Sequence, residues 1–226
     1  MGMFIGIITL AISLLVSAIL KSKFRKFSLT PLRSGLSGRE IAEQMLHDHG
    51  IYDVRVQSVP GRLTDHYNPA DKTVNLSPEV YEGRNAAAAA VSAHECGHAV
   101  QHAKAYGFLK FRSSMVPLLS ATSRFMPWII MIGAGILSST GNPAILGIGV
   151  ALFALTTLFS VITLPVEFDA SKRALAWISN RGIVTTQEYA MSKEALTWAA
   201  LTYVVAAIGS IAELIYWISV LTNRRD

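Results

Sequence analysis

The sequence has very little cysteine and few charged residues. Cys96 is the only cysteine among the 226 residues, which excludes an intramolecular disulfide and leaves no sign of an oxidising compartment. Aspartate, glutamate, lysine and arginine make up 15% of the chain, whereas an average soluble protein has about 25%. Because hydrophobic residues make up 51% and come in blocks, this shortage of charge indicates a protein in contact with lipid.

The formal net charge of +5 would be compatible with nucleic-acid binding, but the placement of the basic residues favours another interpretation. Most of them stand beside apolar blocks, as they do on the cytoplasmic flanks of membrane spans. We therefore expect the lipid bilayer as a partner, and no nucleic acid.

Four apolar blocks approach the roughly 20 residues that a membrane-spanning helix needs, which predicts spans at about residues 3–20, 116–138, 144–164 and 198–221. Arg124 interrupts the second block, where Pro117 and Pro127 predict kinks. Glu213 lies inside the last block, and an intramembrane carboxylate should face protein or water. This last block either spans fully, is re-entrant or lies flat on the membrane.

The basic residues also predict the orientation of these spans. Four of them follow the first block directly, which favours an uncleaved anchor with its N-terminus outside. Near the span ends, the predicted inside carries eleven basic residues: Lys21, Lys23, Arg25, Lys26, Lys104, Lys110, Arg112, Lys172, Arg173, Arg181 and Lys193. The predicted outside carries Arg224 and Arg225. We therefore expect residues 28–112 on the cytoplasmic side of the membrane.

Local sequence patterns predict the elements of this soluble portion. Residues 37–40 and 185–188 have the pattern of a capping box, in which two side chains satisfy free backbone donors at a helix start. Residues 63–67 and 72–76 predict a β-hairpin around a turn that contains asparagine, proline and aspartate. Asn85 predicts the start of a helix that continues to about Tyr106. We expect a mainly α, multi-span membrane protein of one domain, with a small α+β cytoplasmic portion.

The sequence His94-Glu95-Cys96-Gly97-His98 lies in the middle of this helix. His94 and His98 are one turn apart, so both imidazoles lie on one helix face and can reach one Zn²⁺ at about 2.0–2.1 Å. Glu95 lies one residue round the helix, where it can take a proton from a metal-activated water. The pattern therefore predicts a zinc-dependent hydrolase that cleaves peptide bonds.

A catalytic zinc ion needs a third protein ligand. His102 continues the histidine spacing, but its position on a straight helix is about 12 Å from His94, which is too far for one tetrahedral ion. Glu167 is the better candidate, because it follows an apolar block directly and lies on a later predicted helix. Two helices that cross near the membrane surface can build a site from two histidines and one glutamate.

The stretches HECGHAVQHA and LPVEFDASKRAL, with LTDHYNPADKTVNLS before them, resemble the YugP-like family of bacterial membrane zinc metallopeptidases. The resemblance covers about residues 28–205. It implies one catalytic zinc held by His94, His98 and Glu167, with Glu95 as the catalytic acid and base. The order of parts is more distantly similar to HtpX-like and CAAX-prenyl-type membrane peptidases. Those usually place aspartate four residues after the glutamate ligand, whereas this chain has Ser171 there and Asp169 nearby.

Other residues near the motif have two interpretations each. Asp169 could bond a histidine ligand or pair with a neighbouring basic residue. Arg173 or His66 could stabilise an oxyanion, or be a solvated side chain. Residues 65–67, which include Tyr67, predict either a strand edge that binds an extended peptide or hairpin structure alone.

Two residues inside the motif are expected to be structural. Cys96 should point away from the zinc face as a small buried residue. Gly97 should allow another backbone to approach the helix closely.

Two functions remain open from the sequence. The first is an endopeptidase acting on membrane-associated proteins or peptides at the cytoplasmic surface. The second is a zinc-binding membrane chaperone or scaffold without proteolytic activity, whose structural zinc would have four protein ligands and no need of Glu95. A metal transporter would need polar residues in several spans, and Arg124 and Glu213 alone qualify. Nothing in the sequence indicates an oligomeric state or a cleavage specificity.

Overall fold

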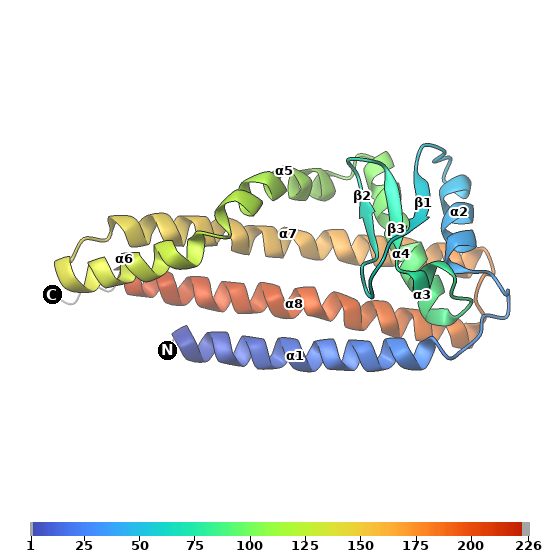
Figure 1. Ribbon diagram of the computed structural model, residues 1–226, viewed down its shortest axis with the longest axis horizontal. Coiled ribbons are helices and arrows are strands. Elements are labelled where there is room, and N and C mark those ends of the chain that lie inside the picture. Colours follow the sequence, from blue (N-terminus) through green and yellow to red (C-terminus); the bar gives the residue numbers. More distant parts are fainter. Residues whose placement is uncertain (1, 223–226) are drawn as a thin grey trace. The chain divides into compact units, whose positions relative to one another are not determined.

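The computed structural model describes residues 2–222 and is mainly helical, with one small three-stranded sheet (Figure 1). The chain divides into two compact units, which are described separately below. The first unit comprises Met1–Leu15, Phe111–Leu164 and Thr202–Asp226. The second unit comprises Val16–Lys110 and Pro165–Leu201.

The first unit contains parts of the apolar helices. These helices are α1 (Gly2–Phe27), α5 (Gly107–Thr122), α6 (Met126–Thr140), α7 (Ala144–Asn180) and α8 (Thr186–Thr222). Within residues 2–222, α1, α7 and α8 are long and apolar enough to cross a membrane. The pair α5 and α6 meets the same test together, but it is bent by 59°, so the number of possible spans is three or four. The second apolar block is therefore bent, at the break just before Pro127, whereas Pro117 lies inside α5.

Prolines act differently in two of these helices. Pro127 occupies the first turn of α6, where its missing N–H costs nothing. We expected a span ending at residue 164 and a separate helix after Pro165. Instead, α7 runs through Pro165 as one helix of 37 residues. A proline inside a helix removes one backbone hydrogen bond, and the rest of the ladder continues on both sides.

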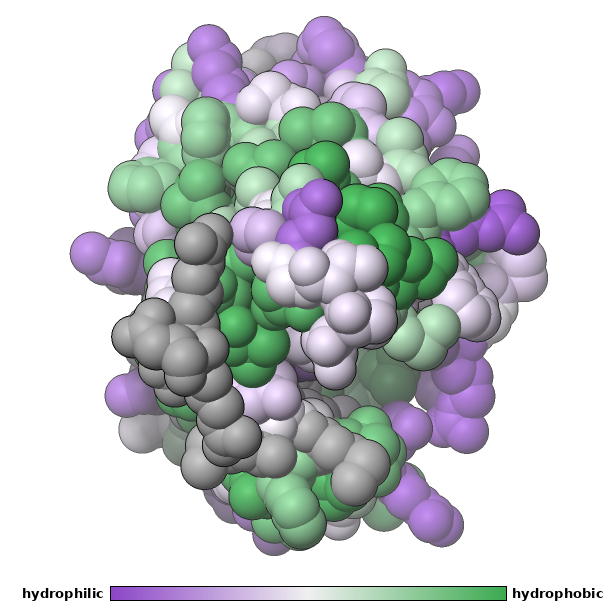
Figure 2. Space-filling view, turned by 90° about the vertical axis from the view of Figure 1, so that its left-hand side faces the viewer, coloured by the Kyte–Doolittle hydropathy of each residue, from purple (hydrophilic) through white to green (hydrophobic). Residues whose placement is uncertain are grey.

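Large apolar side chains are exposed over the first unit, which is the pattern of a surface that contacts lipid rather than water. Exposed examples are Phe4, Ile7, Trp128, Ile132 and Ile215. Figure 2 shows hydrophobic residues over much of the face that it presents, with hydrophilic residues mainly along the rim. The buried side chains of this unit include a small core of Ile130, Leu146, Val150 and Phe153.

The second unit contains the sheet and the shorter helices. Its strands are β1 (Arg55–Ser58), β2 (His66–Asn68) and β3 (Thr73–Leu76), in the order β1-β3-β2. β2 and β3 pair antiparallel with Tyr67 opposite Val74, which confirms the predicted hairpin. β1 pairs parallel with β3, and β2 is therefore an edge strand.

Helix starts in this unit follow the predicted capping patterns. Helix α2 (Gly38–Asp48) has the complete box, since Ser37 N donates to Glu40 at 2.7 Å and Glu40 N donates to Ser37 Oγ at 3.3 Å. The same exchange joins Thr185 and Glu188 before α8, at 2.7 and 3.3 Å. Each box satisfies backbone donors that a helix start leaves unpaired.

The motif helix is α4 (Ala86–Ala103), and it follows the short helix α3 (Pro78–Tyr81). Asn85 caps α4 by accepting a hydrogen bond from Ala88 N at 2.9 Å. The helix ends three residues before the predicted Tyr106, because Ala105 has a left-handed φ of 53° that helical backbone excludes. Its five alanines, 86–90, are all buried, and their small side chains allow α2 to pack closely.

At Gly97 the backbone of α7 approaches the motif helix closely, as expected from the lack of a Cβ. We expect Gly97→Ala to lower the free energy of unfolding by about 1–3 kcal/mol, since a Cβ there would lie 2.6 Å from the carbonyl oxygen of Ala170. Thermal unfolding would measure the loss. Gly107→Ala is the matched control, because nothing lies within 4 Å of its added Cβ. Equal effects of the two substitutions would contradict the close approach.

Candidate metal centre

The two histidines of the motif and Glu167 come together in the second unit. His94 and His98 lie one turn apart on α4, with their rings edge-to-face and the centroids 4.8 Å apart. Glu167 lies on α7, and its Oε2 is 3.3 Å from His94 Nε2 and 3.6 Å from His98 Nε2. The three atoms that could bind a metal lie within 4.8 Å of one another. Glu167 and His98 are buried, and His94 is partly buried.

The two separations of Glu167 Oε2 from the histidine nitrogens are close to those around a tetrahedral zinc ion. Two ligands at 2.0–2.1 Å from such an ion lie about 3.3–3.4 Å apart, because the angle between the bonds is about 109°. The two measured distances, 3.3 and 3.6 Å, are close to this value. Within residues 2–222 the group has three members, which would leave the fourth position of the ion for water or substrate.

Gln101 fixes the orientation of His98. This fully buried side chain donates from Nε2 to the backbone oxygen of Val166 and to Asp169 Oδ2, each at 2.8 Å. Its Oε1 therefore faces His98 Nδ1, 3.0 Å away, and accepts a hydrogen bond from it. With the proton on Nδ1, the lone pair of His98 Nε2 is available to a metal on the side of Glu167.

Ser171 supports the other histidine. Its Oγ lies 3.1 Å from His94 Nδ1, which again leaves Nε2 on the side of Glu167. Ser171 occupies the position where the distantly similar peptidases have aspartate. The structure therefore assigns that position a hydrogen bond to a histidine, made by a neutral hydroxyl in this chain.

The carboxylate of Glu95 is held by the edge strand. Tyr67 N donates to Glu95 Oε2 at 3.0 Å, so the backbone of β2 and the motif helix meet at this residue. The prediction that residues 65–67 form a strand edge is consistent with this arrangement, because β2 is at the edge of the sheet. Peptide binding by that edge stays a prediction.

His102 contacts the same strand rather than the metal-binding group. Its Nδ1 lies 2.6 Å from the hydroxyl of Tyr67. Burial, together with the charge of Asp53, raises the pKa of Tyr67 to about 12. The hydroxyl therefore stays protonated at neutral pH, and its contact with His102 supports β2 beside Glu95.

Electrostatics distinguish the motif residues from one another. Burial lowers the pKa of His98, but hydrogen bonding with Glu167 and the charges of Glu167 and Glu95 raise it overall. The same negative charge favours a bound cation. Burial raises the pKa of Cys96 well above its usual value, and its Sγ points to the backbone oxygen of Ala42 at 3.5 Å. Cys96 is therefore a neutral buried thiol, as predicted.

Comparison with known proteins supports the same chemistry. Residues 2–222 match the family model described as "Putative neutral zinc metallopeptidase". The chain is also 40% identical over 223 residues to "Putative membrane protease YugP" of Bacillus subtilis (strain 168), which covers 99% of this chain and 97% of that relative. The chain belongs to this zinc metallopeptidase family. No solved structure matches it.

Three further residues were singled out from the sequence and lie outside the triad of His94, His98 and Glu167. They are Asp169, Arg173 and His66. Asp169 reaches His98 indirectly, because Gln101 stands between them, and it also pairs with Arg173 at 2.6 Å. The predicted ion pair of Asp169 with a basic neighbour is therefore present, and the structure shows no direct bond from Asp169 to a histidine ligand. His66 is exposed on β2, where its Nδ1 bonds the backbone oxygen of Thr64 at 2.7 Å. Oxyanion stabilisation by Arg173 or His66 stays a prediction.

Gln101 was not identified from the sequence, although it lies three residues after His98 and therefore on the same side of the helix. We expect Gln101→Leu to weaken zinc binding by about 10–100-fold, the usual effect of removing a partner that orients a histidine ligand. Competition with a zinc-binding dye would measure the affinity. Gln57→Leu is the control, because Gln57 bonds Asn75 in the sheet instead. Unchanged zinc affinity in Gln101→Leu would show that this hydrogen bond does not orient His98.

Proposed function

We propose that this chain is a zinc-dependent endopeptidase that hydrolyses peptide bonds of membrane-associated proteins or peptides. The single observation that carries the proposal is the set of three possible metal ligands, His94, His98 and Glu167, with Glu95 on the same helix as the two histidines. Three donors and one free position are the arrangement of catalytic zinc sites, whereas structural sites have four protein ligands. Membership of a zinc metallopeptidase family supports the same conclusion.

The residues of this chain have separate tasks in that reaction. A zinc ion held by the triad would activate water and polarise the carbonyl of the scissile bond. Glu95 takes the proton from the attacking water and later gives it to the leaving amine. The N–H of Tyr67 holds the Glu95 carboxylate in place, which reduces the motion that would otherwise weaken proton transfer.

We also propose that the protein is a multi-pass protein of the bacterial cell membrane, with the triad on the cytoplasmic side. Helices long and apolar enough to span, and the excess of basic residues beside the triad-bearing segments, support this orientation. Lys104→Cys would test it, because Lys104 is exposed and the sole native cysteine is fully buried. In intact cells, a membrane-impermeant maleimide should label this variant only after the membrane is broken. Labelling without disruption would reverse the orientation.

Metal removal tests the proposed activity. The full chain, purified in detergent, should contain about one zinc per chain. It should also cleave unstructured peptides that are added in the same detergent. A chelator should abolish cleavage, and added zinc should restore it. A protein that binds zinc but cleaves no member of a broad peptide library would favour the alternative, a zinc-binding chaperone or scaffold.

A further inference from the structure

A groove in the second unit has Ser171, the hydrogen-bond partner of His94, in its wall. It lies between the part of α7 after Pro165 and the first half of α8, and its volume is about 410 Å³. This volume falls within the range of about 300–1,000 Å³ that is usual for binding sites of small ligands. The residues used below are Phe168, Ser171 and Lys172 on α7 and Lys193, Leu196 and Ala200 on α8.

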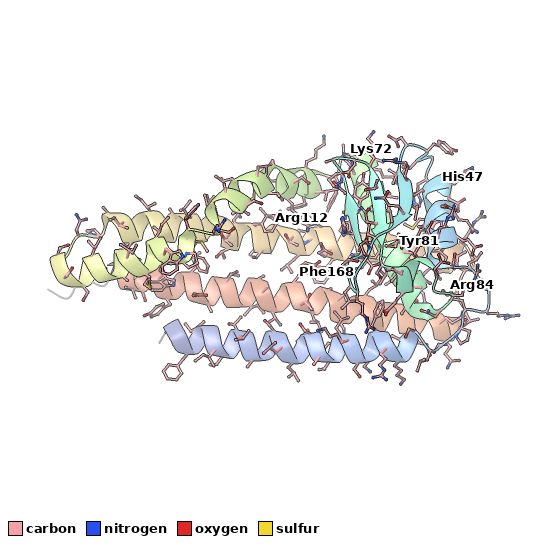
Figure 3. The ribbon with its side chains drawn as sticks, viewed as in Figure 1. His47, Lys72, Tyr81, Arg84, Arg112 and Phe168 are labelled. Atoms are coloured by element: carbon pink, nitrogen blue, oxygen red, sulfur yellow. The ribbon has the colours of Figure 1, made fainter. Side chains whose placement is uncertain are left out.

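The position of the groove links it to the metal centre. Ser171 is part of the groove wall, and its Oγ is the atom that bonds His94 Nδ1. Phe168, which is labelled on α7 in Figure 3, directly follows Glu167 in the sequence and is also part of the wall. A molecule in the groove therefore lies against two residues that adjoin ligands of the candidate metal site.

The lining indicates the chemistry of the occupant. Leu196 and Ala200 are buried in the groove, and Phe168 exposes 50% of its surface there, so the occupant should be apolar. Lys172 and Lys193 are exposed and come from opposite helices, one on each side of the groove. Two positive charges beside an apolar groove complement a ligand that carries a negative charge next to its apolar part.

We propose that this groove binds the substrate itself, as an apolar peptide segment flanked by an acidic side chain near the scissile bond. The inference rests on the proposed peptidase function and adds the substrate class to it. We assign the groove to the substrate rather than to a lipid because Ser171 places one wall of the groove a single hydrogen bond from His94, behind the face of the imidazole that carries Nε2. Residues 197, 200 and 201 of the groove lie at the start of the last predicted span, which suits segments close to the membrane surface.

Two fluorescein-labelled peptides would test the proposal. Both contain four consecutive leucines, followed by glutamate in one and by lysine in the other. Binding is measured by fluorescence anisotropy on the zinc-loaded full chain with Glu95→Gln, so that no cleavage is needed for a signal. We expect this protein to bind the glutamate peptide about fivefold more tightly, since exposed ion pairs contribute modestly.

Lys193→Glu should abolish that preference, because its negative charge offsets that of Lys172, and its exposed position makes a folding defect unexpected. Ala200→Phe should fill the groove and weaken both peptides at least fivefold, with zinc content unchanged. Lys104→Glu is the matched control, because Lys104 is exposed on another element and should leave the preference as it is. Unchanged peptide binding in both groove variants would overturn the proposal.

Two other outcomes separate this proposal from the peptidase function. In one outcome, the chain with native Glu95 cleaves both peptides, and the groove substitutions made in that chain leave kcat/KM unchanged. The groove proposal then fails and the peptidase function stands. If no peptide is cleaved, the peptidase function fails, and the anisotropy result still decides whether the groove binds peptide. A copurified lipid that Ala200→Phe displaces, without any change in peptide binding, would make the groove a lipid site and overturn the proposal.

Discussion

A protein with Glu95→Gln should keep its zinc and lose peptide-bond hydrolysis by about 10²–10⁴-fold, the usual contribution of a general acid and base. The amide of glutamine cannot take a proton from water at neutral pH. Its oxygen can still accept the hydrogen bond from Tyr67 N, so β2 and the motif helix should keep their contact. The change therefore removes proton transfer and leaves the surrounding structure in place.

Two measurements define this result. Cleavage of a fluorogenic peptide gives kcat and KM, and metal analysis gives the zinc content of the same preparation. The loss should fall on kcat, because Glu95 acts in the transition state rather than in substrate binding. Glu43→Gln is the control, since Glu43 is exposed on α2 and pairs with Arg39. Cleavage retained by Glu95→Gln would remove Glu95 from the mechanism.

Replacing Glu167 by glutamine should lower zinc affinity by at least about 100-fold. Residues that only orient a ligand already contribute 10–100-fold, and a direct ligand should contribute more. Glutamine has almost the same shape as glutamate, so the packing of α7 against α4 should persist. Glutamine lacks the negative charge of Glu167, which lies beside the two imidazoles in this buried site and would attract a divalent cation.

The controls for this prediction use matched positions. Glu188→Gln also changes a buried glutamate, but Glu188 accepts hydrogen bonds from Arg33 N and Thr185 N at the start of α8. It should affect stability and leave zinc affinity unchanged. On the motif helix, His98→Ala should lose zinc, whereas His102→Ala, one turn later, should retain it. Zinc affinity that survives in Glu167→Gln, or falls equally in His102→Ala, would contradict the proposed ligand set.

The capping boxes and the hairpin could be predicted because their signals are local. Ser37 and Glu40 are three residues apart, and the side chain of each accepts a hydrogen bond from the backbone N–H of the other at the start of one helix. The same is true of Thr185 and Glu188. The end of α4 was harder to place, since the sequence predicted a helix to about Tyr106 but the chain leaves the helix earlier, at a left-handed Ala105.

The partners of the histidines depend on contacts between segments far apart in the sequence. Sequence spacing offered Asp169 as a direct partner, but Gln101 lies between Asp169 and His98. Ser171 looked like a departure from related families, yet its hydroxyl reaches His94. Both outcomes depend on how α7 packs against α4, where the backbone of Ala170 closely approaches Gly97.

The sequence by itself determined the apolar character of the long helices, the place of the motif on a helix and the pairing of His94 with His98 on one face. These features follow from composition and helical periodicity, which act over a few residues. The tertiary structure alone decided that Glu167 lies 3.3 and 3.6 Å from those histidines, that Gln101 and Ser171 support them, and that Tyr67 holds Glu95. Such distances depend on the packing of α7 and β2 against α4, which periodicity within one segment does not specify.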